Sequence, residues 1–189
     1  MTALERLERT GSRFASLVEG VRAGQWAAPT PCGEWDVAEL VRHVVMGNRI
    51  FVGVLAGSPV APEALYEEYR GHDPGTLAQD AATSAADLVA SLRRPGTLER
   101  TVTIPVGTVP GAVAAEIRVV EDVVHGWDLA TATGQRPGFD EADIESALSF
   151  TERARDLVPP DRKPFADPVP ADPGDPVLDR LVALLGRHP

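Results

Sequence analysis

Apolar residues recur at helical spacing along most of this chain, and this pattern restricts it to a mostly helical fold. In the first such stretch, from about Ala3 to Val21, they are Leu4, Leu7, Phe14, Leu17, Val18 and Val21. Side chains spaced three and four residues apart lie on one face of a helix, which has to be buried against neighbouring elements. The same spacing predicts helices over residues 36–55, 76–92, 112–132 and 140–157, and a short closing helix at 178–185.

The connections between these helices are long and rich in proline and glycine. Residues 57–75 are predicted to be mainly loop, with one helical turn from Leu65 to Tyr69. Thr101 to Ile104 alternates like a strand and is followed by turn residues, which predicts a short β-hairpin. Residues 159–176 are rich in Pro and Asp and are expected to be irregular. The sequence therefore predicts one all-α domain over residues 1–189, a helical bundle with these additions.

Composition narrows the function classes. The formal net charge is −10, which argues against binding to a nucleic-acid backbone. The N-terminus lacks the apolar core of a signal peptide, and no apolar run is long enough to cross a bilayer. Cys32 is the only cysteine, so no intrachain disulfide forms. We expect a cytoplasmic protein without nucleic-acid or membrane partners.

Two segments carry residues suited to metal binding. On a helical wheel of residues 112–132, Glu121, His125 and Asp128 lie on one flank of the apolar stripe, with Arg118 beside them. His43 lies at the edge of the apolar stripe of the second helix. If the two helices pack side by side, His43, Glu121 and His125 aim at one point. Two imidazoles and one carboxylate hold a divalent metal and leave coordination positions open, which suits zinc first, and nickel or iron(II) as alternatives.

Other nearby residues are given lesser roles. Asp128 is a candidate to hydrogen-bond a ligand imidazole or to line the pocket, and Arg118 a candidate to orient a substrate or to pair with a neighbouring carboxylate. Asp122 points the other way on the wheel and is expected to be solvated. Cys32 precedes a helix N-terminus, where a nucleophile is conceivable, but we favour packing behind Trp35. Spacing alone does not decide for a metal, because Glu and His at i and i+4 also form simple surface pairs.

Four segments also resemble a known family. They read PCGEWDVAELVRH at residues 31–43, EDVVHGWDLA at 121–130, and DRL and LGR at 179–181 and 185–187. They resemble the DinB-like metalloprotein superfamily, in the actinobacterial branch that contains the mycothiol-dependent maleylpyruvate isomerase N-terminal domain. The resemblance implies a four-helix bundle that holds one divalent metal through His43, Glu121 and His125. It also implies a reaction that uses a low-molecular-weight thiol such as mycothiol.

These observations give one leading hypothesis and two alternatives. The leading one is a metal-dependent, mycothiol-using enzyme of S-transferase type, in which a thiol sulfur binds the metal and attacks a small electrophile. A metal-hydroxide hydrolase uses the same centre with water as nucleophile. A non-catalytic metal or small-ligand binding protein is the third reading. The expected partners are a small-molecule substrate and a thiol, and monomer and homodimer both stay open.

Overall fold

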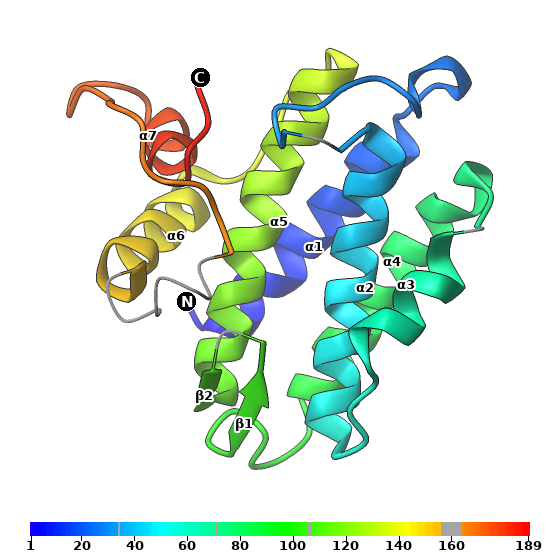
Figure 1. The fold of residues 1–189 in the computed structure, drawn as a ribbon. Coiled ribbons are helices and arrows are strands. Elements are labelled where there is room, and N and C mark those ends of the chain that lie inside the picture. Colours follow the sequence, from blue (N-terminus) through cyan, green and yellow to red (C-terminus); the bar gives the residue numbers. More distant parts are fainter. Residues whose placement is uncertain (34, 71, 106, 156–163) are drawn as a thin grey trace.

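Four long helices pack side by side and form the body of the molecule (Figure 1). The computed structural model describes residues 1–33, 35–70, 72–105, 107–155 and 164–189. In the bundle α1 and α2 each contact both α4 and α5. The bounds are α1 Ala3–Glu19, α2 Val37–Ala56, α4 Pro74–Leu92 and α5 Gly111–Thr133. The predicted all-α four-helix bundle is therefore confirmed.

The second helix begins where its capping residues predict. The backbone N–H of Glu39 donates to Asp36 Oδ1 at 2.8 Å, and the backbone N–H of Asp36 donates to Glu39 Oε2 at 3.0 Å. This reciprocal pair satisfies two backbone donors that a helix start leaves free. The helix ends at Gly57, whose φ of 75° is a conformation that side chains with a Cβ disfavour. These local signals fix the position of His43 inside α2.

The central helix α5 is buried along almost its whole length. Helices α1 and α2 cover it from the bundle, while α6 (Glu141–Ala154) and α7 (Val177–Leu184) lie on its outer side (Figure 1). The expectation that Asp122 is solvated is wrong, because α1 packs over that face of α5. Thr10 Oγ1 donates to Asp122 Oδ2 at 3.0 Å, and burial raises the pKa of Asp122 to about 7. Polar residues of α5 therefore lie in the interior.

The connections are more ordered than the sequence predicts. Helix α3 spans Pro62–Arg70, so the predicted single turn from Leu65 to Tyr69 is too short. Leu65 and Tyr69 stand one turn apart and are both buried in the cluster that contains apolar residues of α2, which explains why the helix extends around them. A short 3₁₀ turn, η1 (Ala23–Gln25), follows α1.

The predicted hairpin is present. Strands β1 (Thr101–Ile104) and β2 (Gly107–Pro110) pair antiparallel, with Thr101 opposite Pro110. Residues 164–176 contain no helix or strand, as expected for the Pro-rich segment. The rest of that segment, and the predicted end of the fifth helix at residue 157, lie outside the described residues. Within the described ranges no helix has the length and apolarity needed to cross a membrane.

Candidate metal centre

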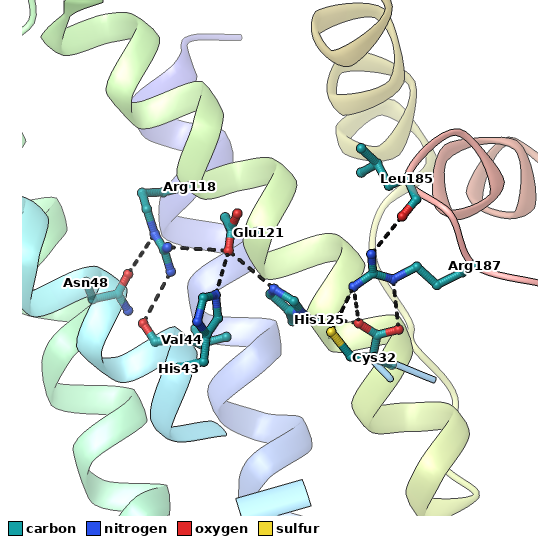
Figure 2. Close-up of polar contacts among 10 residues, drawn as sticks. Cys32, His43, Val44, Asn48, Arg118, Glu121, His125, Leu185 and Arg187 are labelled. Carbon is teal, nitrogen blue, oxygen red and sulfur yellow. Dashed lines mark hydrogen bonds and ion pairs between the residues drawn. The ribbon is translucent and has the colours of Figure 1, made fainter. Parts of the chain in front are cut away.

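The predicted metal ligands meet where α2 packs against α5. Glu121 Oε2 lies 3.3 Å from His43 Nε2 and 3.3 Å from His125 Nε2. Figure 2 shows both imidazoles directed at this carboxylate. One ligand atom from each of the three side chains lies within 4.8 Å of the others. The structure thus brings together all three residues that the sequence selected; their role as metal ligands stays a prediction.

Aromatic rings border the centre on two sides. The Trp35 ring centroid lies 4.4 Å from that of His43 and 5.9 Å from that of His125. Phe165, from the C-terminal segment, lies 5.9 Å from the His125 ring. The His43 side chain is 40% exposed, whereas those of Glu121 and His125 are 9% and 3% exposed. The centre therefore reaches solvent through His43 and is closed around His125.

The second nitrogen of His125 is held by another carboxylate. His125 Nδ1 lies 3.1 Å from Asp128 Oδ2, the hydrogen bond to a ligand imidazole that the sequence suggested. Arg187 donates two hydrogen bonds to this carboxylate, from Nη2 to Oδ2 at 2.9 Å and from Nε to Oδ1 at 3.3 Å. An Nδ1–H···O bond of this kind fixes the ring and leaves Nε2 available to a metal. Arg187 belongs to the LGR motif at residues 185–187, but the sequence does not indicate this contact, because Arg187 is 59 residues from Asp128.

Arg118 faces the interior rather than the opening. It is 3% exposed, and its Nη1 lies 3.7 Å from Glu121 Oε2. Its Nε donates to Asn48 Oδ1 at 3.1 Å, and its Nη2 donates to the carbonyl oxygen of Val44 at 3.3 Å (Figure 2). Of the two roles suggested by the sequence, these contacts favour pairing with a carboxylate of the chain over binding a substrate.

Cys32 does more than pack as a small apolar residue. It is half-buried beside the apolar cluster of α2, and its Sγ also accepts a hydrogen bond from Arg187 Nη2 at 3.2 Å. Ligand atoms of Cys32, His125 and Asp128 lie within 4.8 Å of one another as a second group. The expected apolar packing is therefore incomplete, because Arg187, near the C-terminal end of the sequence, contacts the Cys32 sulfur.

The two remaining histidines belong to neither group. His72 pairs with Asp80, and His188 is exposed.

The charges of the centre are strongly coupled. Burial opposes ionisation of Glu121, but hydrogen bonds from His125 and His43 and the charges of His125 and Arg118 hold its pKa well below the usual range. Burial also disfavours the charged form of His125, yet its contacts with Asp128, Cys32 and Glu121 raise its pKa well above the usual range. Burial, aided by the charge of His125, lowers the pKa of His43. Without metal, a protonated His125 therefore faces the ionised Glu121 and a neutral His43.

The donor set fits a divalent transition metal. Two imidazole nitrogens converge on one carboxylate oxygen, and all three side chains come from the packed helices α2 and α5. Zinc, nickel and iron(II) accept this combination of nitrogen and oxygen ligands. Three protein ligands leave positions for water or substrate, which is typical of catalytic rather than structural sites.

Comparisons with known proteins agree with this architecture. The chain belongs to the mycothiol maleylpyruvate isomerase N-terminal domain family, which matches residues 7–130 and so includes His43, Glu121 and His125. The uncharacterized protein Rv0738 of Mycobacterium tuberculosis (strain ATCC 25618 / H37Rv) is 39% identical over 193 residues, which cover 99% of this chain and 98% of the relative. The uncharacterized protein Rv0036c of the same strain is 28% identical over 186 residues, which cover 85% and 69%.

A solved structure shows the same fold. The crystal structure of the mycothiol-dependent maleylpyruvate isomerase matches with a TM-score of 0.64 and 20% sequence identity. The match covers 76% of this chain and 65% of that chain, so this chain spans just under two thirds of the enzyme. A mutant of that enzyme matches with a TM-score of 0.61. The DinB-like helical fold predicted from the sequence is thereby confirmed.

Proposed function

We propose that this protein is a divalent-metal-dependent enzyme that uses a low-molecular-weight thiol, with mycothiol as the favoured one. The enzyme would either transfer the thiol to a small electrophilic substrate or use it to isomerise that substrate. The observation that carries the proposal is the convergence of His43, Glu121 and His125 at a point that reaches solvent beside Trp35. Membership of a family named for a mycothiol-dependent isomerase supports the thiol. We propose further that the chain acts as a single cytoplasmic domain, with zinc as the favoured metal.

The residues of the chain have distinct tasks in this proposal. His43, Glu121 and His125 would hold the metal, whose charge would favour the thiolate form of a bound thiol at neutral pH. His125 has to release its Nε2 proton before it binds, while Asp128 keeps the proton on Nδ1. Trp35 and Phe165 border the centre and limit access of water from two sides. The exposed edge near His43 is where a small electrophile would reach such a thiolate.

Metal analysis and spectroscopy test the proposal. Purified protein should contain close to one zinc, nickel or iron per chain, and His43→Ala and His125→Ala should lose most of it while keeping their helical circular dichroism. His188→Ala is the matched control, because His188 is exposed and lies outside the cluster. Equal metal content in all four proteins would refute the metal centre.

Titration of the cobalt-substituted protein separates the thiol from water. Mycothiol should give a sulfur-to-cobalt charge-transfer band, and it should bind more tightly than a bare small thiol because its remaining groups contact the opening. A spectrum unchanged by thiols, together with metal-dependent ester or amide cleavage, would replace the transferase with a hydrolase. Neither response over a broad substrate panel would favour a non-catalytic binding protein.

A further inference from the structure

A chain of buried polar contacts crosses the bundle and ends at Glu121. Ser84 on α4 accepts a hydrogen bond from Asn48 Nδ2 at 3.2 Å, and Asn48 Oδ1 accepts one from Arg118 Nε. Arg118 in turn faces the carboxylate of Glu121 one turn further along α5. Ser84, Asn48 and Arg118 are all buried, so no bulk water replaces a lost partner. Arg118 is thus held in one place by contacts from α2 as well as α5.

Gly47 makes the room that Arg118 occupies. It stands on α2 one turn after His43, and a Cβ built there would lie 2.5 Å from Arg118 Nη1, 3.1 Å from Cζ and 3.3 Å from Nη2. Real Cβ atoms essentially never lie as close as 2.5 Å to another heavy atom, so a side chain at residue 47 requires a shift, and the flexible end of Arg118 is the part that can give way. The atom that would clash most, Nη1, is the one that faces Glu121.

We propose that Arg118 is a positioning residue that acts through Glu121, and that Gly47 is the seat that sets the place of its guanidinium. A buried carboxylate needs a nearby compensating charge, because burial alone costs far more than a typical hydrogen bond returns. Arg118 supplies this charge from the side away from the opening, and it faces Oε2, the oxygen that both imidazoles contact. Where it concerns metal affinity, this inference rests on the proposed metal centre.

The proposal predicts that Gly47→Ala changes Tm in opposite directions in the wild-type protein and in the Arg118→Met variant. Gly47→Ala alone should weaken cobalt(II) and zinc binding about tenfold, the lower range for losing a partner that orients a metal ligand. Arg118→Met should weaken it at least as much, and Arg118→Lys less, because lysine keeps the charge. In the Arg118→Met background Gly47→Ala should cause no further loss of affinity. There it should raise Tm, because alanine favours a helix over glycine, whereas in the wild-type background it should lower Tm.

Five proteins and one control test this proposal: wild type, Gly47→Ala, Arg118→Met, Arg118→Lys, the Gly47→Ala/Arg118→Met double variant, and the control Gly24→Ala, where a new Cβ meets open space. Affinities come from metal-competition titrations, and Tm values from the metal-free proteins. Unchanged affinity in Gly47→Ala, or losses that multiply in the double variant, would overturn the positioning role. If wild type binds no metal, the proposed function fails separately. The Tm values then test only whether Gly47 sets the place of the Arg118 guanidinium. Opposite Tm changes for Gly47→Ala in the two backgrounds support this role, and changes of the same sign overturn it.

Discussion

The two nitrogens of His125 face two similar pairs of side chains that are built in different ways. On the bundle side, Nε2 faces Glu121, which Arg118 supports. On the C-terminal side, Nδ1 faces Asp128, which Arg187 grips. The bundle-side pair lies on one helix, three residues apart, whereas Arg187 is 59 residues from Asp128. The same electrostatic arrangement therefore depends on helix geometry on one side and on docking of a distant segment on the other.

This difference separates the tasks of the two sides. The bundle side carries the groups proposed to bind metal, and the packing of α2 against α5 holds them in place. The C-terminal side orients His125 through Asp128, and Arg187 reaches that carboxylate only when the segment that carries it lies against α5. Within that segment the backbone N–H of Arg187 donates to the carbonyl oxygen of Val182 at 3.0 Å. We therefore expect bundle-side variants to remove metal binding and C-terminal variants to tune it.

The largest effect is expected from Glu121→Gln on the bundle side. The amide cannot carry the negative charge that both imidazoles and Arg118 face, so affinity for zinc should fall by about 100-fold or more, beyond the usual range for orienting residues. Competition against a chromogenic chelator measures it. Glu145→Gln, an exposed change on α6, should bind zinc like wild type. A Glu121→Gln protein with near-normal affinity would remove Glu121 from the ligand set.

A smaller loss is expected on the C-terminal side. Arg187→Met leaves Asp128 without its partner and should reduce zinc affinity about tenfold, and Asp128→Asn by about 10- to 100-fold. Arg187→Met should also make residues 164–189 more sensitive to limited proteolysis, since it loses contacts with Asp128 and Cys32. Arg153→Met, on the exposed side of α6, is the control. If Arg187→Met costs as much affinity as Glu121→Gln, the two sides do not differ in the way proposed.

The pH dependence of metal binding connects the two sides. The pKa of His125 is raised and that of His43 lowered, so between about pH 6.5 and the His125 pKa one proton leaves His125 for each metal bound. Affinity should therefore rise about tenfold per pH unit in this window and level off above the His125 pKa. Asp128→Asn removes a contact that raises this pKa, so the plateau should begin at lower pH. Calorimetry in buffers of different ionisation enthalpy counts the proton. A flat profile would show that His125 is already neutral.

The smallest effect is expected for Cys32→Ser. The serine hydroxyl still accepts a hydrogen bond from Arg187, and Cys32 does not belong to the group of His43, Glu121 and His125. Zinc affinity should change by less than about threefold, which is no more than the net contribution of a single hydrogen bond. Thiol-dependent turnover should persist. Complete loss of turnover with metal retained would move the nucleophile from the small thiol to the protein.

The sequence by itself determined the helices and one side of the centre. Apolar spacing predicted the four bundle helices, and Asp36 with Glu39 marked the start of α2. Helical geometry also placed Arg118, Glu121 and His125 on one flank of α5, because side chains three and four residues apart share a face. Together with His43 near the start of α2 and the family resemblance, these residues predicted the group that the structure brings together, although spacing alone did not decide for a metal.

Only the tertiary structure decided which elements cover that flank. Periodicity shows that side chains share a face but not what packs on it, so Asp122 was expected in solvent and lies under α1. The contacts of Arg187 and Phe165 with the centre join segments far apart in the chain, and they depend on how the C-terminal segment docks on α5. The seat at Gly47 is likewise invisible in the sequence, because it exists only where the end of Arg118 reaches across from the neighbouring helix.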